Sequence, residues 1–183
     1  MVKINSGFHK IAWEFLLSCL QVKINGGYIA ENERQIIIAS PWISDLSNKN
    51  LSLNTSLYHG VQMNVRRRLS SLSNVLITLA EHDFDVVVVT SEPGCTKWKR
   101  DWEGLQVERD RNLQELWSKK GIRLYHSKKS HVKSISTPVG IIDGSANLTD
   151  NGFFKNMEHM EVTDSTESGF GQARYVVQQL IPN

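Results

Sequence analysis

A histidine and a lysine open the stretch of this chain that is richest in potential chemistry, HVKSISTPVGIIDGSANL, residues 131–148. One residue separates His131 from Lys133, and in an extended strand that spacing directs both side chains to the same face. An imidazole beside a fixed ammonium group suits a protein core poorly, but it suits attack on an anionic ester. Lys133 would neutralise the ester oxygens while His131 attacks. The pair therefore predicts a nucleophilic site for an anionic ester.

A turn of small residues, Gly144-Ser145-Ala146-Asn147, follows the pair. A turn of this kind that leads into a helix directs backbone N–H groups outward, an arrangement that favours phosphate. Asn147 adds a side-chain donor, and Ser145 can orient its neighbours. Glu158, on the next expected strand, could accept a hydrogen bond from the His131 ring and fix its tautomer, as a triad acid does. The ordered set lies between apolar strands and predicts a site for an anionic phosphate ester.

The set resembles the signature of the phospholipase D superfamily, H-x-K-x4-D-x6-G-S-x-N. The resemblance runs from IRLYHSKKSHVK through GSANLTDNGF, and more loosely to the apolar runs IIIASPWISD and DVVVVTSE upstream. It implies that His131 is a nucleophile that forms a phosphohistidine. It also implies that Lys133 and Asn147 bind the non-bridging oxygens, that Ser145 supports the site, and that Glu158 holds the histidine ring.

The chain departs from the signature at two points. Pro138 stands five residues after Lys133, where the signature has Asp, and the stretch from the histidine to Gly-Ser is one residue short. Asp143 is out of register and is not assigned that role. His126 begins a second H-x-K, but its spacing to G-S-x-N fails, so His131 is the family histidine. The family Asp is regarded as structural, so its loss bears on loop geometry; a degenerate, inactive copy stays an alternative.

The signature occurs only once in the 183 residues. Phosphodiester cleavage through histidine needs one neutral imidazole that attacks and one imidazolium that protonates the leaving oxygen. The superfamily supplies these two groups from two motif copies, and this chain is too short for two such domains. We therefore expect a homodimer with one shared active site, to which each protomer contributes one His131. Single-copy members of the family are mostly nucleases, so the resemblance implies a nuclease.

The segment 97–133 carries the charge that such a substrate would need. It holds 11 Lys and Arg against 5 Asp and Glu, a local charge of +6 in a chain whose net charge is +2. Basic residues suit phosphates and aromatic rings stack on bases, so we expect substrate contacts from Gly144 and from Lys97, Trp98, Lys99 and Arg100. DNA is favoured over RNA. Trp117, at helical spacing from Leu113, is expected in the core instead.

Apolar spacing predicts the elements that position these residues. Unbroken apolar runs are typical of strands covered on both faces. Strands that alternate with helices indicate an α/β fold: one domain over 1–183, with a mixed, mostly parallel central sheet and helices on both faces. The expected helices are 8–22, 65–79, 109–120, 166–181 and one starting over 147–154; the expected strands are 36–39, 85–90, 122–127, 131–136, 138–143 and 158–164; 44–60 and 95–108 are expected to be irregular.

Composition narrows the class of protein. The sequence has two cysteines, Cys19 and Cys95, a polar N-terminus and no apolar run near the length of about 20 residues that a membrane span needs. We expect a cytoplasmic protein that needs no cofactor and no metal ion, since no cluster of Asp, Glu and His has metal-ligand spacing. Two other functions stay open: a phospholipid phosphodiesterase, and a non-catalytic nucleic-acid-binding subunit.

Overall fold

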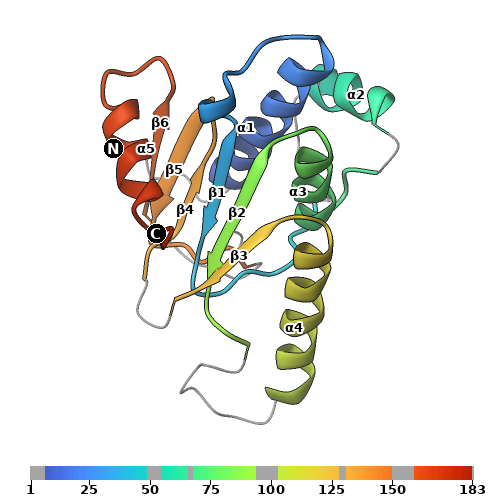
Figure 1. The fold of residues 1–183 in the computed structure, drawn as a ribbon, viewed down its shortest axis with the longest axis vertical. Coiled ribbons are helices and arrows are strands. Elements are labelled where there is room, and N and C mark those ends of the chain that lie inside the picture. The colour runs from blue at the N-terminus through green and yellow to red at the C-terminus, as the bar shows by residue number, and fades with distance from the viewer. Residues whose placement is uncertain are drawn as a thin grey trace.

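The computed structural model describes residues 7–48, 55–65, 68–93, 103–127, 131–149 and 159–182. Within these residues, one six-stranded sheet has the strand order β3-β2-β1-β4-β5-β6 (Figure 1). The strands are β1 Gln35–Ala39, β2 Asp85–Thr90, β3 Arg123–His126, β4 Ser134–Ser136, β5 Gly140–Gly144 and β6 Met160–Asp164; the helices are α1 Gly7–Ile24, α2 Thr55–Asn64, α3 Leu72–Glu81, α4 Glu103–Lys119, α5 Phe170–Gln178 and the short 3₁₀ helix η1 Glu31–Glu33.

The mixed sheet is confirmed, but the expectation that it is mostly parallel is wrong. β1 pairs in parallel with β2, and β2 with β3, whereas the pairs β1–β4, β4–β5 and β5–β6 are antiparallel. Only three residues connect β4 to β5, and a parallel pair needs a crossover of a dozen or more. Continuous apolar runs indicate burial on both faces but do not fix strand direction, because a helix-covered antiparallel strand looks the same.

Helices cover both faces of the sheet, as expected. Alternate residues of β1 belong to two separate apolar clusters, Ile36 and Ile38 to one, and Ile37 and Ala39 to the other. Helices α1, α3 and α4 contribute to the first cluster, and α5 contributes Val177 to the second. Trp117 of α4 is buried as expected, and its Nε1–H donates to a serine hydroxyl of α3 at 3.0 Å.

Several element boundaries differ from the sequence-based ones. Helix α2 begins at Thr55, inside a segment expected to be irregular, and α4 begins at Glu103 rather than at 109. Helix α3 begins only at Leu72, because Ser71 has extended backbone angles and its hydroxyl accepts from the Asn74 N–H as an N-cap. Strand 85–90 is confirmed as β2, and 36–39 lies within β1.

The turn between β4 and β5 contains the Pro138 that replaces the signature Asp. The Thr137 hydroxyl donates to the Gly140 carbonyl at 2.9 Å and accepts from the Gly140 N–H at 3.1 Å. A Cβ on Gly140 would lie 2.3 Å from the Phe15 ring of α1. The turn is therefore closed by a neighbouring threonine and packed under a helix, and it lies at the opposite end of β4 from Lys133.

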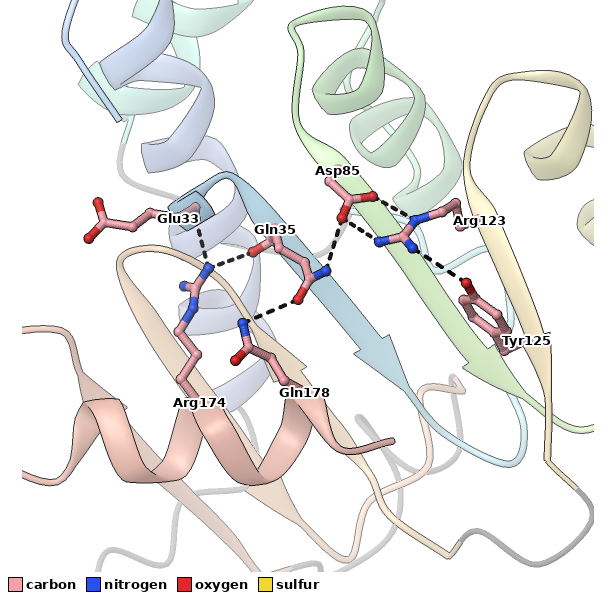
Figure 2. A network of polar contacts seen from close by, with 7 residues as sticks. All are labelled: Glu33, Gln35, Asp85, Arg123, Tyr125, Arg174 and Gln178. Atoms are coloured by element: carbon pink, nitrogen blue, oxygen red, sulfur yellow. Dashed lines mark hydrogen bonds and ion pairs between the residues drawn. The ribbon is translucent and has the colours of Figure 1, made fainter. Parts of the chain in front are cut away.

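A polar network ties α5 to the amino ends of the parallel strands (Figure 2). One Arg174 nitrogen donates to the carbonyls of Glu33 at 2.7 Å and Gln35 at 3.0 Å. The Gln35 side chain in turn donates to Asp85, and Arg123 forms an ion pair with the same carboxylate. These contacts lie at the amino ends of β1, β2 and β3, so the carboxyl ends of these strands lie at the opposite end of the sheet. No helix in the described part of the chain has the length and apolarity to cross a membrane.

Candidate active site at the carboxyl end of the sheet

The antiparallel half of the sheet brings the two motif segments to one edge. Lys133 immediately precedes β4 and Gly144 ends β5, and the Gly144 N–H donates to the Lys133 carbonyl at 3.0 Å. Ala39 at the end of β1 pairs with Ser134, so the carboxyl ends of β1, β2 and β3 lie at the same edge. Open α/β sheets bind ligands outside the carboxyl ends of their strands, which makes this edge the candidate site.

His131 and Lys133 precede β4 instead of lying within it. Strand β4 begins at Ser134, so the expected strand over 131–136 is three residues shorter at its start. His131 is exposed and Lys133 is half-buried. The Lys133 ammonium donates to the His131 backbone carbonyl at 2.6 Å. This hydrogen bond holds the cation beside the segment that carries the imidazole.

Gly144 is a glycine because β6 passes directly against it. A Cβ at this position would lie 2.2 Å from the His159 carbonyl oxygen and 2.9 Å from the Met160 Cα. Both atoms belong to the backbone, so neither can move aside without separating the strands. Because the Gly144 N–H already bonds to Lys133, the structure gives this residue a packing role, and its contact with substrate stays a prediction.

Ser145 joins the small-residue turn to the start of β6. The Ser145 N–H donates to the His159 carbonyl at 2.9 Å, and the His159 N–H donates to the Ser145 hydroxyl at 3.0 Å. This reciprocal pair fixes the direction in which the chain leaves β5. The expected role of Ser145 in supporting a phosphate site stays a prediction. Glu158, Lys97, Trp98, Lys99 and Arg100 lie outside the described residues, so their expected roles stay predictions.

Asn147 is positioned by the loop that follows β1. The Leu148 N–H donates to the Ser40 hydroxyl at 3.2 Å, and the Leu148 carbonyl accepts from the Ser44 N–H at 2.8 Å. Leu148 also pairs with Ile43 in a parallel bridge. Residues 147–149 therefore do not start the expected helix: Leu148 lies in the bridge, and the Thr149 N–H turns back to donate to the Asn147 carbonyl at 2.8 Å. The rest of that helix, 150–154, lies outside the described residues.

The Asn147 side chain carries a buried acceptor. Its Oδ1 atom has no hydrogen-bond partner among the described residues. A buried acceptor without a partner costs about 1–3 kcal/mol, and native proteins leave few such atoms, many of them at functional sites. The amide is therefore held at the site edge by its backbone, not by hydrogen bonds of its own oxygen.

Ser40 is a positioning residue that sequence reasoning missed. Its hydroxyl is buried and links two loops, since it donates to the Trp42 carbonyl at 2.7 Å and accepts from Leu148. The sequence marks Ser40 only weakly, by a Ser-Pro dipeptide that follows an apolar strand. Nothing local indicates a partner 108 residues away.

Replacing Ser40 with alanine is expected to lower the free energy of unfolding by about 1–3 kcal/mol, because the buried Leu148 N–H loses its acceptor. Urea unfolding followed by circular dichroism measures the change. Ser118→Ala, at an exposed position of α4, is the matched control and is expected to leave stability unchanged. A Ser40→Ala protein as stable as the wild type would mean that the hydroxyl does not hold the two loops together.

His126 lies across the parallel strands from the start of β4. It ends β3, and β2 and β1 lie between β3 and β4, so three strand spacings, roughly 14 Å, separate it from the start of β4. Its ring bonds instead to the Gln114 side chain at 2.8 Å, in a groove of about 550 Å³ beside α4. The sequence spacing between His126 and G-S-x-N also excludes His126 from the signature.

Asp143 lies on the face of the sheet that α5 covers. It pairs with Ser134 and Glu161, and directly paired residues share a face of the sheet. Ser134 also pairs with Ala39 of the α5-side cluster. Burial raises the pKa of the Asp143 carboxyl, and the nearby Glu161 adds to this effect. Among the residues that the structure describes, no three His, Cys, Asp or Glu side chains form a group that could hold a metal ion.

Comparisons with known proteins add a distant likeness among solved structures. No family profile matches the sequence, and no curated protein matches it. Among solved structures, NucT from Helicobacter pylori is similar with a TM-score of 0.45 and 12% sequence identity, over 93% of this chain and 87% of that chain. A likeness at this identity and TM-score establishes neither a shared activity nor a shared site, so the function is inferred from the residues.

Proposed function

We propose that this protein is a metal-independent phosphodiesterase that cleaves nucleic acid, DNA in the first place, through a phosphohistidine. The contact that best supports the proposal is the hydrogen bond from the Gly144 N–H to the Lys133 carbonyl. Through it, two segments that resemble the halves of one signature meet at the edge where open α/β sheets bind ligands. The Ser145–His159 and Ser40–Leu148 contacts fix the turn that carries Asn147.

The roles proposed for the residues follow from their chemistry. A neutral His131 ring nitrogen attacks the phosphorus, so that an N–P bond forms as the P–O bond to the leaving group breaks. A second imidazole, protonated at the start, gives its proton to the leaving oxygen and then takes one from the water that hydrolyses the phosphohistidine. Lys133 and the Asn147 amide N–H groups balance charge on the non-bridging oxygens, and Glu158 holds the ring.

The second imidazole is proposed to come from a second protomer. Among the described residues, His126 begins the other H-x-K, and three strand spacings separate it from the start of β4. A shared site therefore requires a two-fold dimer. Sedimentation is expected to give about 42 kDa, twice the 20.8 kDa chain. A strictly monomeric protein that stays fully active at nanomolar concentration would rule out the shared site.

The proposed substrate rests on the charge of segment 97–133. Changing Lys97, Trp98, Lys99 and Arg100 together to alanine is expected to weaken DNA binding and to flatten its salt dependence. Each lost phosphate contact reduces the slope of log affinity against log salt by about 0.9 on duplex DNA. Fluorescence anisotropy over a salt series measures the slope. An unchanged slope would remove these four residues from the interface.

A non-catalytic nucleic-acid-binding subunit is the second candidate, and the Pro138 departure favours it. The Thr137 hydroxyl closes the turn at that point, at the far end of β4 from Lys133, which weakens this alternative. Incubation of the protein with plasmid and single-stranded DNA in EDTA separates the two functions. Cleavage in EDTA that depends on His131 supports the enzyme, whereas binding without cleavage supports the subunit.

A further inference from the structure

Trp42 is a large apolar side chain that stays at the surface on a firmly held backbone. Its side chain is 42% exposed, whereas the next residue, Ile43, is 7% exposed and belongs to the core. The Trp42 carbonyl accepts from the Ser40 hydroxyl at 2.7 Å, and the preceding Pro41 carbonyl accepts from the Ser91 N–H at 3.3 Å. The loop therefore presents the indole outward from a fixed position.

The bridge between Ile43 and Leu148 places Trp42 beside Asn147. In a parallel bridge, the two residues one position earlier are neighbours, and their side chains lie on the face opposite to the bridged pair. Ile43 and Leu148 are both buried in the core, whereas Asn147 is half-buried and Trp42 is exposed. Trp42 lies three residues after Ala39, and His131 lies three residues before Ser134, the partner of Ala39. Because these strands are antiparallel, both residues extend from the same end of the sheet.

We infer that Trp42 stacks on a nucleobase next to the phosphate that is cleaved. This inference rests on the proposed function and names the part of the substrate that the phosphate-binding residues leave unbound. An indole ring stacks on any base because every base has a π-face, so the contact aids binding without reading sequence. A base held on a rigid loop would also fix the position of its phosphate relative to His131.

The surface apolar residues that the structure describes provide a matched control. Tyr28 is 83% exposed and precedes β1, so it lies towards the amino end of that strand, away from the candidate site. Tyr28→Ala removes an exposed aromatic ring of similar chemistry without touching the loop after β1. Trp42→Phe keeps an aromatic face at the position itself.

The test compares two substrates that share a leaving group, thymidine 5′-(p-nitrophenyl phosphate) and its analogue with a hydrogen in place of the base. Trp42→Ala is expected to lower kcat/KM for the thymidine ester by about 10- to 100-fold, the range for loss of one stacked base. It is expected to change kcat/KM for the base-free ester by less than twofold, and Trp42→Phe should recover most of the loss. Tyr28→Ala should behave as the wild type.

Equal losses on both esters, or no loss on either, would overturn the inference. In both cases the effect of Trp42→Ala would not depend on the base. If wild-type protein hydrolyses neither ester, or if His131→Ala hydrolyses both, the proposed function fails by itself. Stacking is then measured by anisotropy with oligothymidylate and with an abasic oligomer of equal length. A preference for oligothymidylate that Trp42→Ala removes supports the inference without turnover, and equal binding by both proteins overturns it.

Discussion

Replacing His131 with alanine is expected to abolish phosphodiester cleavage in EDTA, a loss of about 10⁴-fold or more. Without the imidazole no N–P bond can form, and Lys133 and Asn147 have no nucleophile to assist. The rate of plasmid nicking in excess EDTA measures the effect. The matched control is His126→Gln, which alters the other H-x-K histidine at the end of β3 and is expected to keep the wild-type rate.

The same residue tests the shared site. In a mixed dimer with one His131→Asn chain, either the nucleophile or the acid is missing, so the mixed dimer is expected to be inactive as well. Wild-type cleavage should show a bell-shaped dependence on pH, because one imidazole must be neutral while the other is protonated.

Two results would contradict the histidine mechanism. Acid quench of the wild-type reaction should trap a phosphoramidate on His131, and its absence under rapid quench would argue against a covalent intermediate. Cleavage that needs a metal ion and survives His131→Ala would point to a different site. Retention of half the activity in the mixed dimer would leave the mechanism but remove the shared site, because each protomer would then be complete.

Replacing Gly144 with alanine is expected to lower the free energy of unfolding by about 1–3 kcal/mol, the range for overpacking, and to reduce activity together with stability. The new methyl group would meet the His159 carbonyl oxygen and the Met160 Cα at distances that real Cβ atoms do not show. β6 would have to move away from β5, and the Ser145–His159 pair would lengthen. Urea unfolding and plasmid cleavage measure the two effects.

Gly171→Ala is a control that is expected to leave the free energy of unfolding unchanged or to raise it. Gly171 lies in α5, and a Cβ there meets nothing within 4 Å. Alanine loses less conformational entropy than glycine when a helix forms, so this variant is expected to match the wild type or to gain up to about 1 kcal/mol. A Gly144→Ala protein as stable as Gly171→Ala would show that the close approach of β5 and β6 is not required.

Much of the local structure was predictable because its cause is local. Val86–Val89 form an unbroken apolar run that ends in polar residues, and β2 follows that run. The spacing of Ile11, Phe15, Leu16 and Leu20 predicted α1, and all four contribute to or pack against one apolar cluster. Helix ends were less predictable, since the start of α3 depends on the conformation of Ser71 and on one side-chain hydrogen bond.

By itself, the sequence identified the candidate residues for the proposed chemistry and the order in which they occur, because residue type and spacing are written in it. The antiparallel direction of β4 relative to β1 was decided by the tertiary structure, since no local turn joins these two strands and an apolar pattern does not encode direction. The tertiary structure also decided the contacts at the candidate site. Gly144 is required by a strand that arrives from elsewhere in the chain, and Ser40 meets Leu148 across 108 residues. Such contacts depend on register between distant segments, which only the assembled sheet fixes.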